Sequence, residues 1–202
     1  VYTLPLLVAL LPNTCVAAVV TQVLEAGDTR LRVEIVDVAD PARVRMLQRW
    51  VAETAEATKR QSGPFSLHDA YVQVREIDSD DASPVPWGQT RRQQEVGVLL
   101  YVRRDATYAQ LRADWTAVHE FTHLFHPYLG ESGRWLAEGL ASYYQNVTRA
   151  RMGILPPEHA WERLDTGFRR GQAAETGTRL DAMGRARGGT MPPLPWSASG
   201  QA

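Results

Sequence analysis

His119-Glu120-Phe121-Thr122-His123 is the stretch of sequence that decides how this chain is interpreted. Two histidines four residues apart on a helix are separated by about 40° around its axis, so both imidazole rings face the same side. Two such rings can bind one zinc ion, and the glutamate between them can then accept a proton from the attacking water. The pattern predicts that His119 and His123 are zinc ligands and that Glu120 is the general base.

A second stretch, Trp135-Leu136-Ala137-Glu138-Gly139, supplies a carboxylate that completes the predicted zinc site. Glu138 lies fifteen positions after His123, a gap long enough for a turn and the start of a second helix. Two histidines and one glutamate leave the fourth position of a tetrahedral zinc ion open, which is the pattern of a catalytic site rather than a structural one. We therefore expect one zinc ion, held by His119, His123 and Glu138.

These assignments have alternatives. A helix can carry two surface histidines that bind no metal, and Glu138 can be an exposed helix charge. His126, close to one turn beyond His123, is the other candidate for the third ligand. Because Pro127 ends the helix at that point, Glu138 fills the role better.

Length and composition narrow the class of protein. The 202 residues suit one domain, and a chain of this size buries enough surface to fold without disulfide bonds. The formal net charge of −1 argues against nucleic acid as the main partner and leaves a peptide or protein substrate as the expected one. Cys15 is the only cysteine, so no internal disulfide can form.

Residues 4–20 form an apolar stretch, interrupted by Pro5 and Pro12, that is too short and too broken to span a bilayer. It resembles the apolar core of a secretory signal with Val16-Ala17-Ala18 as the cleavage site, although neither Met nor a positive charge precedes it. We expect residues 1–18 to be a signal peptide, which would make the protein secreted or periplasmic. The alternative is a buried N-terminal strand in a cytoplasmic protein.

Hydrophobic periodicity outlines the secondary structure around the motif. Alternation and apolar runs predict strands at 31–38, 70–77 and 96–102, with a loop at 78–87. Helical spacing predicts helices at 41–60, 107–126, 135–151 and 156–170, the first of them capped by Asp40. From 171 to 202 Gly and Pro accumulate and the periodicity fades, so we expect an irregular, poorly ordered or truncated tail.

At two stretches the chain resembles a known family. Val118 to His123, followed by Trp135-Leu136-Ala137-Glu138-Gly139-Leu140-Ala141-Ser142-Tyr143-Tyr144, is similar to the gluzincins, the zinc metallopeptidases whose third ligand is glutamate. The resemblance is greatest to the catalytic domain of the glycyl aminopeptidase family and looser to aminopeptidase N and thermolysin. It covers residues 31–170 and is sharpest between 115 and 150.

The resemblance implies a fold and an activity. The fold is α+β and zincin-like, with a small, mostly antiparallel sheet packed on the motif helix, further helices after it, and a domain over residues 19–170. The activity is zinc-dependent peptide-bond hydrolysis, with His119, His123 and Glu138 as ligands and Glu120 as the base.

The resemblance also implies how substrate is bound. The strand at 96–102 is expected to be the sheet edge that pairs with the substrate backbone. Glu95, just before it, is either a ligand for a substrate amine, as a glutamate is in aminopeptidase N, or a solvated strand-end charge.

The chain departs from the family pattern at the group that steadies the tetrahedral intermediate. The stretch 171–202 contains neither tyrosine nor histidine for this role, and Tyr128, Tyr144 and His159 are the nearest substitutes. Loss of such a donor costs about 10²–10³ in rate. We therefore expect weak or no hydrolysis from this chain alone, and the alternative function is a zinc-binding pseudoenzyme or interaction module.

Overall fold

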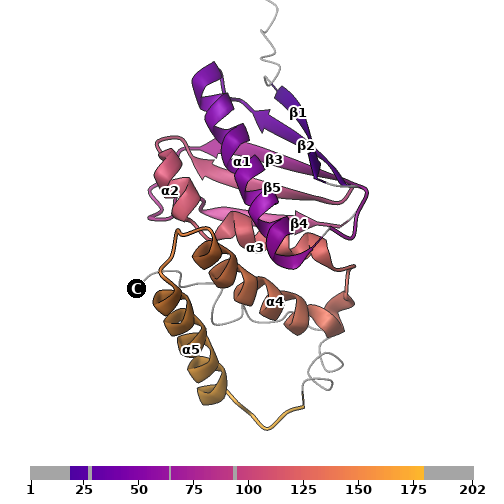
Figure 1. The fold of residues 1–202 in the computed structure, drawn as a ribbon, viewed down its shortest axis with the longest axis vertical. Coiled ribbons are helices and arrows are strands. Elements are labelled where there is room, and N and C mark those ends of the chain that lie inside the picture. Colours follow the sequence, from indigo (N-terminus) through magenta and orange to yellow (C-terminus); the bar gives the residue numbers. More distant parts are fainter. Residues whose placement is uncertain (1–18, 27–28, 64, 93–94, 180–202) are drawn as a thin grey trace, which may run out of the picture.

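The computed structural model describes residues 19–26, 29–63, 65–92 and 95–179, which form an α+β fold with a small mixed sheet and several helices (Figure 1). The strands are β1 (Val19–Ala26), β2 (Thr29–Val36), β3 (Asp69–Ile77), β4 (Trp87–Arg91) and β5 (Gly97–Arg103). The helices are α1 (Pro41–Ser62), α2 (Tyr108–Ala113), α3 (Thr116–Thr122), the 3-10 helix η1 (His123–Phe125), α4 (Gly130–Arg151) and α5 (Pro157–Ala173).

The sheet is mixed, so the expectation of a mostly antiparallel sheet is wrong. The described strands follow the order β1-β2-β3-β5-β4. The outer pairs, β1 with β2 and β4 with β5, are antiparallel, while β2, β3 and β5 run parallel at the centre. For β2 and β3 the physical reason is the connection through α1, because a strand–helix–strand crossover returns the chain in its original direction, which a short hairpin cannot do. Between β3 and β5 the chain first forms β4, which runs antiparallel to β5.

One face of the sheet carries the core. Val33 lies beside Val72, and Val72 beside Val98, so every second residue of the central strands points to the same face. Helix α1 covers this face with Leu47 and Trp50, and all five of these side chains are buried (Figure 1). The alternation predicted for residues 31–38 is therefore an inward-facing row on β2.

The start of α1 follows the predicted capping chemistry. The Asp40 side chain accepts a hydrogen bond of 2.9 Å from the backbone N–H of Ala42, and Pro41 occupies the first turn, where no N–H is needed. The helix ends at Gly63, whose φ of 91° is in the region that favours glycine. The predicted cap is confirmed.

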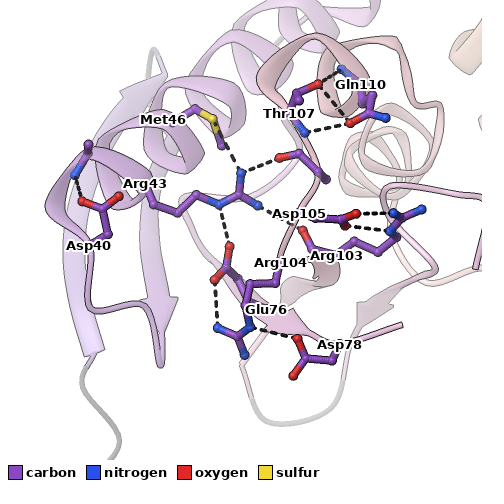
Figure 2. A network of polar contacts seen from close by, with 12 residues as sticks. Asp40, Arg43, Met46, Glu76, Asp78, Arg103, Arg104, Asp105, Thr107 and Gln110 are labelled. Carbon is purple, nitrogen blue, oxygen red and sulfur yellow. Dashed lines mark hydrogen bonds and ion pairs between the residues drawn. The ribbon is translucent and has the colours of Figure 1, made fainter. Parts of the chain in front are cut away.

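An ion-pair network fixes α1 to the ends of β3 and β5 (Figure 2). The buried Glu76 carboxylate accepts hydrogen bonds from Arg43 of α1 and from Arg104, which also bonds Asp78. Arg43 donates in addition to the backbone oxygen of Arg103 at 3.0 Å. Because Glu76 has two cationic partners, its burial carries no unpaired charge.

Strand β4 is an edge of the sheet, which corrects the expectation that the strand at 96–102 is the edge. The loop predicted at 78–87 ends where β4 begins, and the strand predicted at 96–102, observed as β5, lies inside the sheet between β3 and β4. Trp87-Gly88-Gln89-Thr90-Arg91 lacks a run of apolar residues and contains glycine, so propensity alone does not indicate a strand.

The motif helix predicted at 107–126 is broken into α2, α3 and η1. Thr107 and Gln110 form a capping box at the start of α2. Asp114 is extended, with ψ of 151°, and its carboxylate accepts a 2.7 Å hydrogen bond from the backbone N–H of Thr116. This local capping bond competes with a continuous helix and starts α3 afresh.

The last two helices lie close to their predicted positions. Helix α4 begins at Gly130, earlier than the predicted residue 135, and α5 ends at Ala173. The irregular tail predicted at 171–202 begins too early, because α5 continues to Ala173; residues 174–179 lie outside any helix or strand. The rest of that tail, and the signal peptide expected at 1–18, lie outside the described residues. Within the described part of the chain, none of the helices combines the length and apolar character that crossing a bilayer requires.

Candidate metal site

Three side chains converge where α3 faces α4. His119 comes from α3, His123 from the junction with η1, and Glu138 from α4, and one ligand atom of each lies within 4.8 Å of the others. The Nε2 atoms of His119 and His123 are 3.3 and 3.8 Å from Oε2 of Glu138. Tetrahedral zinc with ligand bonds of about 2.0–2.2 Å holds its donors about 3.3–3.6 Å apart. In donor type and spacing, the cluster could bind a metal ion of this kind.

His126, the other candidate for the third ligand, is outside this cluster. Its ring is near that of His123, with centroids 5.8 Å apart. Its Nδ1 lies 2.8 Å from the backbone oxygen of Pro127, which can only accept, so Nδ1 carries the proton. Glu138 rather than His126 completes the cluster of the described residues.

Burial and neighbouring charges decide where protons reside in the cluster. Burial lowers the pKa of His119, but its hydrogen bond to Glu138 and the charge of Glu120 outweigh this, so that pKa is raised. Burial and the charge of His119 lower the pKa of His123 to about 3. Burial would raise the pKa of Glu138, yet His119 and His123 lower it. A proton on His119 thus faces an ionised carboxylate, and a bound cation would replace that proton.

Gln145 orients the first histidine. Its Oε1 lies 2.8 Å from Nδ1 of His119, so Nδ1 donates this hydrogen bond, and Nε2 is the ring nitrogen that faces Glu138. Gln145 is not among the site residues that the sequence motifs predict. The available signal was its spacing, because a residue seven positions after Glu138 returns to the same face of α4 after two turns.

The C-terminal end of α3 is held by Arg92, which follows β4. The Arg92 guanidinium donates to the backbone oxygens of His123 and, at 2.9 Å, of His126. Carbonyl groups at a helix end have no partner within the helix, and a cation complements their partial negative charge. Arg92 therefore fixes the turn that carries His123.

Glu120, the predicted base, is buried between α3 and β4. The hydroxyl of Thr90 lies 2.9 Å from Oε2 of Glu120. Burial raises the pKa of the Glu120 carboxyl, against the lowering effect of the positive His119 and of the Thr90 hydrogen bond. A carboxylate with a raised pKa is better suited to accept a proton and later return it.

The remaining sequence-predicted residues have other surroundings. Glu95 is exposed and pairs with Arg32 at 2.6 Å, which favours the solvated-charge interpretation. Tyr128 is 64% exposed and donates to Glu131, and His159 is exposed on α5. Tyr144 packs edge-on against Tyr143. These contacts give none of the three proposed donors a bond to the cluster.

Comparison with known proteins finds matches among solved structures alone. No protein-family model and no curated protein matches the sequence. Among solved structures, the crystal structure of an aminopeptidase N family protein from Idiomarina loihiensis matches with a TM-score of 0.45 and 10% identity. The match covers 70% of this chain but only 27% of that one. The functional proposal accordingly rests on the site itself.

Proposed function

We propose that the protein is a zinc-dependent peptide hydrolase of the gluzincin type. The observation that carries the proposal is the convergence of His119, His123 and Glu138 within 4.8 Å of one another. Glu120 adds a buried carboxylate on the same helix as His119. This combination suits hydrolysis, because the ligand set leaves one zinc position open and the adjacent carboxylate can manage protons.

Each residue of the site has a role in the proposed reaction. Zinc held by the two histidines and Glu138 supplies Lewis-acid chemistry, lowering the pKa of water to near 7 and polarising a carbonyl group. The Glu120 carboxylate accepts a proton from the attacking water and then passes that proton to the leaving amine. Gln145 keeps the His119 ring in one tautomer and orientation.

The free edge of β4 is the proposed support for an extended substrate. Strand β4 is the edge strand on this side of the described sheet and lies beside α3 (Figure 1). Unpaired backbone groups of an edge strand can bond an added peptide strand. In this role β4 takes the place of the strand predicted at 96–102, because both edges of that strand, β5, are paired, one with β3 and the other with β4.

A second candidate is a zinc-binding module without hydrolytic activity. It is favoured by the surroundings of Tyr128, whose hydroxyl is bonded to Glu131 rather than to the cluster. Without a hydrogen-bond donor for the oxyanion of the tetrahedral intermediate, hydrolysis is about 10²–10³ times slower.

Metal analysis combined with a peptidase assay tests the proposal. We expect one equivalent of zinc after mild dialysis of protein expressed with zinc. We also expect weak hydrolysis of a panel of aminoacyl and internally quenched peptides. Glu120→Gln should abolish it while retaining zinc, because the amide cannot accept the proton. Less than about a tenth of an equivalent of zinc excludes both candidates, since such sites normally retain the metal.

The two candidates differ in the result of the assay. Zinc binding with no turnover in the wild type favours the non-hydrolytic module. Equal turnover in the wild type and Glu120→Gln would exclude Glu120 as the base. Loss of zinc in Glu120→Gln would instead assign Glu120 a structural role.

A further inference from the structure

We propose that Thr90, on the edge strand β4, is the positioning residue that holds the Glu120 carboxylate. This inference rests on the proposed function, because it gives a role to Thr90 through the general base. It concerns how the base is aimed and adds no second active site.

The contact is made at the tip of the Glu120 side chain. The Thr90 hydroxyl lies 2.9 Å from Oε2 of Glu120 and also 2.9 Å from its backbone oxygen. A hydroxyl has one proton, so it donates to one of these acceptors at a time. Both acceptors belong to the same residue, so the hydroxyl ties the backbone and the carboxylate of Glu120 to the sheet.

Gly88, two residues earlier, brings β4 close enough for this bond. A Cβ atom at Gly88 would lie 2.9 Å from Cγ of Glu120 and 2.7 Å from Cγ2 of Thr116, which is closer than real side chains approach. The strand backbone therefore lies directly against the Glu120 stem, in space that only glycine leaves free.

The pleat of β4 directs Gly88 and Thr90 to the same side. Gly88 pairs with Leu100 and Thr90 with Val98, and both partners are buried on the face that the helices cover. The intervening Gln89 is exposed on the opposite face. Thr90 is thus turned towards α3 by the register of the sheet, independently of any bound metal.

In this proposal strand β4 has two roles: it orients the Glu120 carboxylate and it supports the substrate backbone. Glu120 is buried, so few alternative partners are available to its carboxylate, and a single hydrogen bond can select one orientation. The outer edge of the same strand is the proposed support for the substrate backbone. A substrate bound to β4 would therefore be held by the strand that also aims the base.

The test compares side chains with and without the hydroxyl. Thr90→Val keeps the shape and Thr90→Ala removes bulk, and both lose the donor, whereas Thr90→Ser keeps it. Zinc content and thermal stability are measured first, and then the dissociation constant of leucine hydroxamate by calorimetry. A hydroxamate chelates zinc while its acidic proton is shared with the general base, so its affinity reports the position of Glu120.

We expect Thr90→Val and Thr90→Ala to retain zinc and to bind leucine hydroxamate about tenfold more weakly, as loss of a hydrogen bond to a charged group implies. Thr90→Ser should bind within about twofold of the wild type. In a Glu120→Gln background, Thr90→Val should change the affinity by less than about twofold, because Thr90 acts through the carboxylate. In turnover, Thr90→Val should lower kcat about tenfold and leave KM unchanged.

Three results would overturn the inference while leaving the proposed function intact. They are unchanged hydroxamate affinity in Thr90→Val and Thr90→Ala, an equal loss in the Glu120→Gln background, or a Thr90→Ser variant as weak as Thr90→Val. Failure of the proposed function has a different signature, because the zinc-loaded wild type would then hydrolyse no peptide. That result would overturn both proposals.

Discussion

Helices α1 and α4 are each 22 residues long, yet they bury opposite kinds of surface. α1 presses Leu47, Trp50 and Val51 against the sheet and exposes charged residues such as Arg45, Arg49 and Glu56 to solvent. α4 buries Asn146 and Arg149, among others. α1 therefore contributes apolar area that stabilises the core, whereas α4 also places polar side chains, Glu138 and Gln145, beside His119 of α3.

The orientation of α4 leaves apolar side chains in solvent. Leu136 is 40% exposed and Tyr143 is 37% exposed, although hydrophobic spacing places them on one stripe. On the other side, Glu138 and Gln145 reach His119. Contacts with the histidines, rather than the apolar stripe, therefore decide which face of α4 meets α3.

The largest expected effect concerns the site face of α4. Glu138→Ala should reduce zinc from one equivalent to less than about a tenth, because two histidines alone hold the ion poorly. Elemental analysis after dialysis measures this, and Glu131→Ala, an exposed change on the same helix, is the matched control. Retention of zinc by Glu138→Ala together with its loss from His126→Ala would mean that His126 is the third ligand.

A substitution on the core-facing side of α1 should change the stability of the fold and leave zinc binding intact. Trp50→Ala should lower the free energy of unfolding by about 3–5 kcal/mol, since it leaves a cavity under a fully packed sheet. Urea denaturation gives the value, and the folded fraction should still bind zinc as the wild type does. A loss below about 1 kcal/mol would contradict the assignment of α1 as the scaffold helix.

A smaller effect is expected from the outer partner of His119. Gln145→Ala should weaken zinc binding about 10–100-fold with little change in thermal stability, because the ring loses its orienting acceptor. Competition with a chromogenic chelator measures the affinity. Gln145→Glu keeps an acceptor and should retain most of the zinc affinity. Equal zinc affinity in the wild type, Gln145→Ala and Gln145→Glu would show that Gln145 does not orient His119.

The smallest effect tests the exposed stripe of α4. Leu136→Gln should change the free energy of unfolding by less than about 0.5 kcal/mol, as surface substitutions do. The same substitution at the fully buried Leu47 of α1 should cost several times more. Chemical denaturation of both variants measures the contrast, and similar losses would indicate that Leu136 is covered.

Sequence reasoning succeeded where one segment carries its own information. The cap at Asp40 and the central strands could be predicted because caps and alternation depend on neighbours in the chain. It failed at Asp114, where a side-chain bond to Thr116 breaks a pattern that looks continuous. It failed also at β4, which is a strand because β5 pairs with it and not because of its own propensity.

The sequence by itself determined the chemistry that is proposed, since a four-residue spacing fixes both histidines on one side of a single helix turn and sets Glu120 between them. Only the tertiary structure decided which residues surround that chemistry. Thr90, Arg92 and Gln145 reach the motif from a sheet edge, a strand end and another helix. Helix geometry is a property of adjacent residues, whereas these contacts depend on parallel strand order and on which face α4 buries, and no local pattern encodes either.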